Sequence, residues 1–258
     1  MSATQPLAAR PSKPTPSKPS PINFGSALRV EAHKLLDTRA NQAVIAGLLA
    51  LSACFGIGYA AIAKTQPSAS GILGAAVGPG NWLLMVLSIL LISSEFTRRT
   101  AVHTFTLDPN RPRVLSAKAL VLLGAAVLVL VLGLAISLLA VWTAPVFGAP
   151  RALLDFDASR LAVVLGSLCF TTMTGLAWGL LARNAAAPLV FLLLWPTVSH
   201  ILGNVSQRAA EILGWINIEP VWTMDSSLRS WAMLATSALV WVVLPGALGT
   251  FRLLRADL

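Results

Sequence analysis

The chain has 258 residues, of which 56% are hydrophobic and 11% are charged, and its mean hydropathy is +0.75. Soluble domains carry about 25% charged residues. This chain therefore has too little charge to cover a water-exposed surface, which predicts an all-α polytopic membrane protein. Its net charge of +9 does not indicate nucleic-acid binding, because the basic residues flank apolar segments, where anionic lipid explains them better.

The first residues differ in composition from the rest. Residues 1–21 contain six prolines and two copies of Pro-Ser-Lys-Pro, so we expect residues 1–23 to form a disordered tail. We do not expect them to be a secretory signal, because the first apolar run begins only near Ala40. We expect residues 24–258 to form one transmembrane domain.

Residues 24–37 combine an apolar stripe with polar faces. The stripe has helical spacing and consists of Phe24, Leu28, Ala32, Leu35 and Leu36. The other faces carry Arg29, Glu31, His33, Lys34 and Asp37. This pattern predicts an amphipathic helix that lies in the plane of the membrane interface.

Six segments are long and apolar enough to cross a membrane. A hydrocarbon core about 30 Å thick needs about 20 helical residues at 1.5 Å per residue. The sequence predicts transmembrane helices over residues 40–63, 71–94, 115–140, 161–182, 185–202 and 230–251.

Glycines and prolines modify this pattern. The pairs Gly74/Gly78 and Gly175/Gly179 have the GxxxG spacing that allows helices to approach closely, although membrane helices are rich in glycine and chance competes with this interpretation. The run Gly78-Pro79-Gly80 should kink or interrupt the second helix, and Pro188 and Pro196 should break the fifth.

A polar island, residues 95–113, separates the second and third apolar segments. Residues 97–107 have the spacing of a short helix, which Asp108-Pro109 should end. Five basic residues mark this exit from the membrane: Arg98, Arg99, Arg111, Arg113 and Lys118. Two interpretations follow from the residues alone, a solvated basic loop that fixes topology and a docking element for a soluble partner.

Residues 204–229, before the last apolar segment, are too polar to span a membrane and too apolar for an open loop. We expect short interfacial or re-entrant helices there. Just before them, His200 lies at the end of the fifth segment, where it is either a contact for a proton or substrate or an interface histidine satisfied by water.

Most of the 19 lysines and arginines lie on one side of a six-helix arrangement, which contains the termini, the island and the turn at Arg183. The positive-inside rule assigns that side to the cytoplasm. Both termini and the island are therefore expected in the cytoplasm.

The sequence has no motif for its own nucleotide, metal or nucleophilic chemistry: GxxxxGK[ST], HExxH, CxxC and GxSxG are all missing. We expect no catalytic residue and no cofactor on this chain. We expect no carboxylate in mid-membrane, because Glu95 lies only at the inner edge of the second apolar segment. That expectation weakens a proton- or sodium-coupled transporter.

The segment Ser94–Phe105, the run Pro109–Leu120 and the amphipathic start Leu28–Leu36 together resemble the membrane subunit of type-2 class ABC exporters, which have the type V exporter fold. In that family an E-F/Y-R-x-G-T stretch leaves the second span, a coupling helix follows, and a P-x-R-x-x-x-x-x-K run leads into the third span. Here Thr97 and Arg99 depart from the commonest form, and Thr100 stands where glycine is frequent.

The resemblance implies a permease in a bacterial plasma membrane, without an ATPase site of its own. A separate ATP-binding subunit, which carries ATP and Mg, would dock on a cytoplasmic coupling helix. A second permease chain, identical or related, would complete the path for an amphipathic or hydrophobic substrate such as a drug, lipid or peptide. The implied coupling residues are Glu95, Arg98, Arg99, Thr100, His103, Thr104, Thr106 and Arg111, and the implied outer gate contains His200, Trp215, Glu219 and Trp222.

Two other classes stay open. One is a channel or secondary transporter that works without ATP. The other is a membrane-anchoring subunit of an ABC-type complex that transports nothing.

Overall fold

The computed structural model describes residues 24–63, 66–97, 111–148, 150, 152–220 and 227–255. The predicted tail, residues 1–23, and the predicted coupling helix lie outside this part. The elements, in chain order, are α1 Phe24–Asp37, α2 Arg39–Ile62, α3 Ala69–Thr97, α5 Arg111–Thr143, η1 Ala144–Phe147, α6 Ala158–Ala182, α7 Ala186–Val205, α8 Gln207–Trp215, α9 Leu228–Ala238, η3 Leu239–Val243 and α10 Leu244–Arg255.

Six helical stretches among the described residues are long and apolar enough to cross a membrane. They cover Arg39–Ile62, Ala69–Ser94, Pro112–Val146, Ala158–Ala182, Ala186–Val205 and Leu228–Leu253. The prediction of an all-helical fold with six helices long and apolar enough to cross a membrane is confirmed. The third stretch is longer than the predicted 115–140, since α5 starts at the end of the island and continues into η1.

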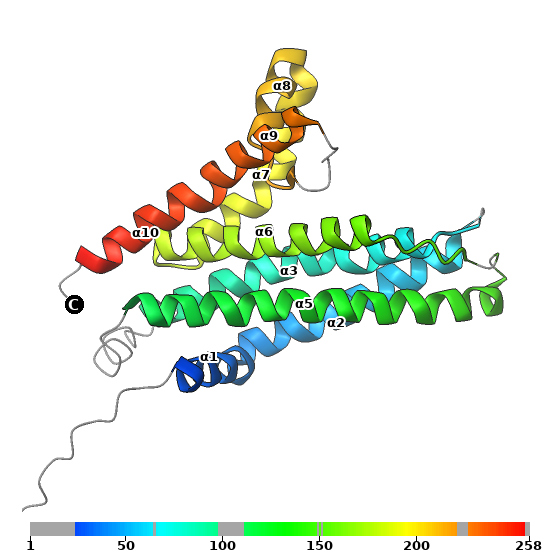
Figure 1. The fold of residues 1–258 in the computed structure, drawn as a ribbon, viewed down its shortest axis with the longest axis horizontal. Helices are drawn as coiled ribbons and strands as arrows, with labels where there is room; N and C mark the ends of the chain where they lie inside the picture. The colour runs from blue at the N-terminus through cyan, green and yellow to red at the C-terminus, as the bar shows by residue number, and fades with distance from the viewer. Residues whose placement is uncertain are drawn as a thin grey trace, which may run out of the picture.

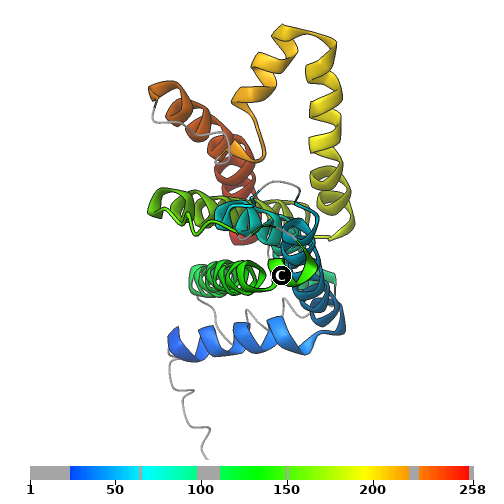
Figure 2. The same ribbon diagram turned by 90° about the vertical axis from the view of Figure 1, so that its right-hand side faces the viewer.

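The helices form two parts, shown in Figure 1. Helices α2, α3, α5 and α6 run alongside one another, and α3 packs against the other three. Helices α7 to α10 rise away from this bundle, with α10 returning to pack on α6 (Figures 1 and 2). Helix α3 is the central element, and its span is more buried than those of the other five.

Glycines on α6 let it approach α3 closely. A Cβ atom added at Gly175 would lie 2.5 Å from the backbone oxygen of Met85, and one at Gly179 would lie 2.3 Å from Ile92 Cγ2. The other predicted pair, Gly74 and Gly78, differs, because a Cβ atom at either position would meet nothing within 4 Å. Those two glycines leave space instead of closing a helix contact.

The prolines do not interrupt the helices, contrary to the break predicted for the fifth span. Helix α3 continues through Pro79, and α7 continues through Pro196. Pro188 is accommodated because it lies in the first turn of α7, where the missing N–H has no helical partner. Interior prolines are tolerated in membrane helices where neighbouring groups satisfy the freed backbone.

Aromatic rings join α7 to the rest of the protein. Trp178 on α6 lies with its ring centroid 4.9 Å from that of Phe191 on α7. Trp241, in the wide π-helical turn η3 between α9 and α10, lies 5.3 Å from Trp195 and 5.9 Å from Trp178. Aromatic pairs at such distances add about 0.5–1.5 kcal/mol each beyond area burial.

The loop before α6 caps the N-terminus of α3. Leu153 accepts a hydrogen bond from the Ala69 N–H, and Ser68 Oγ accepts one from Gly71. Between them, the carboxylate of Asp155 accepts bonds from the Ser70 N–H at 2.9 Å and from the Ser70 hydroxyl at 2.6 Å. Three backbone donors that the helix leaves open are thus satisfied, and a negative charge lies at the positive end of the helix dipole.

Helix α1 is held to α5 by a buried ion pair. Glu31 is 3% exposed and Lys118 is 0% exposed, and the Lys118 ammonium donates to the Glu31 carboxylate. Lys34, one turn along α1, donates to the other carboxylate oxygen at 2.8 Å. The sequence placed Glu31 on a polar face and Lys118 among the basic residues of the membrane exit. Both are instead buried, because each charge neutralises the other.

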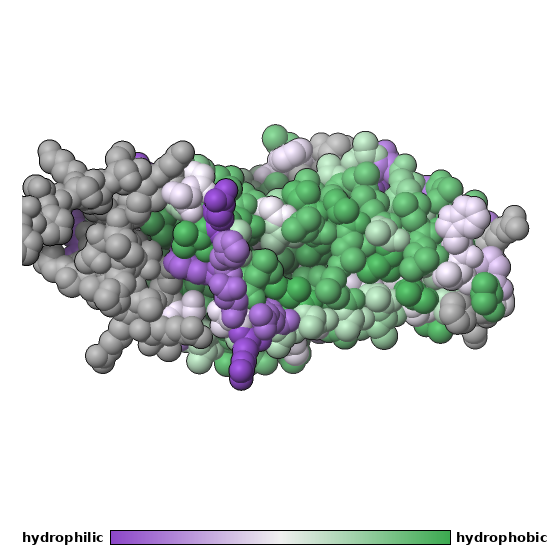
Figure 3. Space-filling view, turned by 90° about the horizontal axis from the view of Figure 1, so that it is seen from below, coloured by the Kyte–Doolittle hydropathy of each residue, from purple (hydrophilic) through white to green (hydrophobic). Residues whose placement is uncertain are grey.

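The orientation of α1 differs from that of the long helices. Figure 2, which looks along the bundle, shows α1 lengthwise, so this helix lies across the bundle. In Figure 3, a hydrophilic band crosses an otherwise hydrophobic face. Helix α1 has three exposed polar residues, Arg29, His33 and Asp37. The amide of Gln42 in α2 donates to the Leu36 carbonyl at 2.8 Å. This hydrogen bond links the end of α1 to the start of α2.

The buried pair predicts a specific pattern of stabilities. Lys118→Met should destabilise the protein by about 3 kcal/mol, because it leaves a buried carboxylate without its main partner. Lys34→Met should cost under about 1 kcal/mol, because Lys34 is 35% exposed and its ion pair is screened by solvent. The double variant Glu31→Leu/Lys118→Met should recover most of the loss. Thermal unfolding of the purified protein measures all three, and equal effects of the two lysine variants would contradict the assignment.

The α3 cap predicts a pH dependence. The hydrogen bonds from the Ser70 side chain and backbone lower the pKa of Asp155 below its ordinary value of 3.8. The ionised form is thus favoured by folding, so its stabilisation is full above that value and is lost as the pH falls through the lowered pKa. Asp155→Asn should cost about 0.5–1 kcal/mol near neutral pH, since the carboxylate is exposed, and less in acid. Unfolding temperatures measured from about pH 6 to pH 3 test this, with the exposed Asp37→Asn as control.

Candidate functional site

The polar island is described only at its two ends. Helix α3 ends at Thr97 and α5 begins at Arg111, so the backbone of Glu95 and of Arg111 is placed. The other predicted coupling residues lie outside the described part, namely Arg98, Arg99, Thr100, His103, Thr104 and Thr106. Their predicted role stays a prediction.

Several segments gather at the end of the bundle where the island begins and ends. The C-terminal ends of α3, α6 and α10 and the start of α5 all lie at the left-hand end in Figure 1. A pocket of about 470 Å³ lies there, and its lining includes the side chains of Arg183, Arg252 and Arg255. Arg183, in the left-handed conformation that ends α6, places its guanidinium 5.7 Å from the centre of the Phe96 ring. This end of the protein is therefore basic.

The structure describes three of the four residues predicted as an outer gate, namely His200, Trp215 and Glu219. His200 is exposed on α7, and its Nδ1 lies 3.2 Å from the Asn204 amide one turn further on. Trp215 ends α8 and is 37% exposed. Trp222 lies outside the described residues. Of the three that the structure describes, Glu219 is the one that enters the interior of the helix assembly.

Glu219 reaches the middle of α3. The Asn81 amide donates to the Glu219 carboxylate at 3.0 Å. Asn81 is about twelve residues from the start of α3, or about 18 Å at 1.5 Å per residue, which is close to the midpoint of its span. A carboxylate thus lies beside the midpoint of a span-length helix, a position where the sequence predicted none. Glu219 is outside every apolar segment, but the chain before it enters between the helices.

Three contacts hold that entering segment. The Trp241 indole donates to the Ile216 carbonyl at 2.9 Å, and the Ser237 hydroxyl donates to the Trp215 carbonyl at 3.2 Å. The Asn217 side chain accepts a bond from the Glu219 N–H at 3.1 Å. Ile218, between them, is 3% exposed and belongs to the same apolar cluster as Trp241. These contacts direct the Glu219 side chain toward α3.

Asn81 joins Glu219 to α6. Its side-chain oxygen accepts hydrogen bonds from the Thr171 hydroxyl at 2.8 Å and from the Ser167 hydroxyl at 3.2 Å. Because the oxygen is used in this way, the amide nitrogen must face Glu219. Asn81 was not predicted as a site residue, although a carboxamide directly after Gly78-Pro79-Gly80 in an apolar helix is a signal that the sequence carries.

The Glu219 carboxyl is largely surrounded by apolar groups. Burial raises its pKa above the ordinary value of 4.5, and the hydrogen bond from Asn81 acts in the opposite direction. Within the described ranges, no lysine, arginine or histidine forms an ion pair with it. Desolvation without a cationic partner makes this carboxylate a favourable place for a positive charge.

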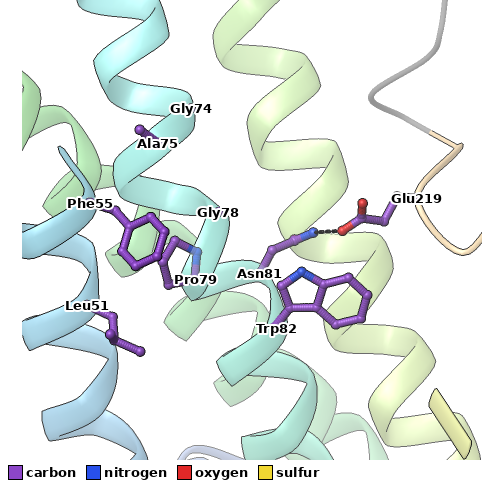
Figure 4. Close-up of a pocket in the computed structure, with 9 residues that line it drawn as sticks. All are labelled: Leu51, Phe55, Gly74, Ala75, Gly78, Pro79, Asn81, Trp82 and Glu219. Carbon is purple, nitrogen blue, oxygen red and sulfur yellow. Dashed lines mark hydrogen bonds between the residues drawn. The ribbon is translucent and has the colours of Figure 1, made fainter. Parts of the chain in front are cut away.

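Asn81 and Glu219 also border a pocket of about 690 Å³, drawn in Figure 4. The two side chains point toward one another, with the Trp82 ring beside them. The other lining residues belong to α2 and α3, and they are Leu51, Phe55, Gly74, Ala75, Gly78 and Pro79. In the part of the chain that the structure covers, no group of three His, Cys, Asp or Glu side chains is arranged to hold a metal ion.

Comparison with known proteins adds no identification. No family model matches the chain, and no curated protein matches it.

Proposed function

We propose that this chain is the permease subunit of an ATP-binding cassette exporter, with the type V exporter fold and six spans. A separate ATPase subunit hydrolyses ATP and docks on the coupling helix formed by the island. A second permease chain completes the transport path. The complex resides in a bacterial plasma membrane, with both termini in the cytoplasm.

The observation that carries this proposal is the gathering of basic and polar segments at one end of the bundle. Helix α3 ends and α5 begins there (Figure 1). The three arginines at 183, 252 and 255 line one pocket at the same end. By the positive-inside rule that end faces the cytoplasm, where an ATPase subunit is found. Helix α1, which lies across the bundle with Arg29 and His33 exposed, is suited to the interface on the same side.

The connection between α1 and α5 gives the docking element a mechanical role. Lys118 lies seven residues after Arg111, the first residue of α5, and it pairs with Glu31 of α1. A displacement of the island therefore moves the start of α5 and, through this ion pair, α1. The other end of the island continues directly into α3, the central helix. In this way a motion of the ATPase subunit reaches both the core and the interface helix.

A second candidate function has one observation in its favour. A carboxylate near the midpoint of a span is the kind of group that proton- or cation-coupled transporters use, and Glu219 is such a group. A transporter of that class moves substrate without ATP. Transport by the chain alone in liposomes, driven by a proton gradient, would favour this candidate over the exporter.

The exporter proposal makes a prediction about the island. The affinity-purified chain from its native host should carry a cassette ATPase in stoichiometric amount, and the complex should hydrolyse ATP. The triple variant Arg98→Ala/Arg99→Ala/His103→Ala should lower this ATPase activity at least about tenfold, a loss of about 1.4 kcal/mol in coupling, because it removes the basic docking face.

A matched variant controls for charge. Arg29→Ala/His33→Ala/Arg39→Ala removes the same residue types from exposed positions near the same end of the protein. This control should retain most of the ATPase activity. Equal activity in both triple variants, or a purified chain that carries no ATPase, would contradict the proposal.

A further inference from the structure

The pocket beside Glu219 has the size and lining of a ligand site. Its volume of about 690 Å³ lies within the range of roughly 300–1,000 Å³ that is usual for small-molecule sites. The walls are apolar and aromatic, with Phe55 contributed by α2 and Trp82 by α3 (Figure 4). Gly74 and Gly78 add no side-chain volume, and a Cβ atom at either position would meet nothing within 4 Å.

The polar groups of the pocket are one carboxylate and one carboxamide. Asn81 is 1% exposed, and both ends of its amide group are engaged, by Glu219 on one side and by the hydroxyls of α6 on the other. Asn81 therefore orients Glu219 and has little capacity left for a ligand. The Asn81 amide donates to only one carboxylate oxygen of Glu219, Oε1, and carries no charge that could balance the carboxylate.

The place of the pocket determines how a ligand arrives. Leu51 is 41% exposed and Phe55 is 55% exposed on the outer surface of α2, so the pocket opens sideways on a hydrophobic face. Asn81 lies near the middle of the α3 span. A ligand that enters there comes from the hydrocarbon region and must itself be lipophilic.

We propose that this pocket binds a lipophilic organic cation, whose positive charge pairs with the Glu219 carboxylate. The Trp82 and Phe55 rings contact its apolar groups, and the indole face adds a cation–π attraction of the kind worth about 0.5–2 kcal/mol. A neutral or anionic molecule of the same shape leaves the carboxylate unpaired, so the site selects for positive charge. As a substrate site this pocket rests on the exporter proposal, but binding of the cation is a property of the chain alone.

Tetraphenylphosphonium is a suitable probe, and tetraphenylborate is an anion of nearly the same shape. Equilibrium binding of radiolabelled tetraphenylphosphonium to the purified full chain in nanodiscs should be saturable and should resist competition by tetraphenylborate. Glu219→Gln should weaken the affinity at least about tenfold, because it removes the balancing charge while keeping the side-chain shape. Glu211→Gln is the matched control, since Glu211 is an exposed carboxylate on α8, and it should leave the affinity unchanged.

A second pair of variants tests the cavity without touching its polar network. Gly74→Leu fills the pocket and should lower the affinity severalfold. Gly47→Leu adds the same side chain in open space on α2, outside the pocket, and should have no effect. This pair keeps the proposal testable even where Glu219→Gln unfolds the protein.

Two results would overturn the proposal. The first is unchanged phosphonium binding in both Glu219→Gln and Gly74→Leu, or equal binding of the borate. The second is a combination of two findings. The unmodified chain does not bind the phosphonium, and a Gly74→Cys variant forms a disulfide between two copies of the chain. That combination would assign the pocket to a protein contact. Because these measurements use no ATPase subunit, a failed exporter proposal and a failed binding site give different results.

Discussion

The position of Asn81 depends on a constraint that the bilayer imposes, namely that every buried polar group must find its partner within the protein. Asn81 satisfies this constraint by bonding to two hydroxyls of α6 and to one carboxylate from the segment before α9. The amide thus joins α3 and α6 of the bundle to the segment before α9, which belongs to the part that rises away from the bundle in Figure 1. Gly175 and Gly179 make this arrangement possible, because they bring α6 close enough to α3 for the hydroxyls to reach.

The same constraint explains how charges are distributed. Glu31 and Lys118 are buried together, so their desolvation is offset by their mutual attraction and by Lys34. Asp155 is exposed and instead completes the hydrogen bonds of the α3 N-terminus. Glu219 differs from both, since its described partner is a neutral amide. A carboxylate of this kind is costly for folding, and that cost is the physical reason to associate it with ligand binding.

Much of the architecture could be predicted from composition and periodicity. Long apolar runs identified all six spans, because hydropathy alone decides which helices fit a bilayer. Partnerships between distant residues could not be predicted in this way. Nothing in the local pattern of α1 indicates that Glu31 faces Lys118, which is 87 positions away, rather than water. Similarly, the depth of Glu219 depends on how residues 215–218 are held by Trp241 and Ser237, and the sequence around Glu219 carries no information about those contacts. The break predicted at Pro188 and Pro196 does not occur, because the local rule ignores the place of Pro188 in the first helical turn and the neighbours that can satisfy a freed backbone group near Pro196.

The wide turn η3 has a consequence for the last membrane-crossing stretch. A π-helical turn accommodates one residue more than an α-helical turn, so the faces of α9 and α10 are out of phase across Leu239–Val243. A single helical wheel drawn from Leu228 to Arg255 would therefore misplace the side chains on one side of this turn by about 100°. The extra residue lets Trp241 point toward Ile216 while Gly246 and Gly249 still face α6. Removing one residue at this turn would rotate everything after it by about 100°, and the C-terminal arginines would then face a different neighbour.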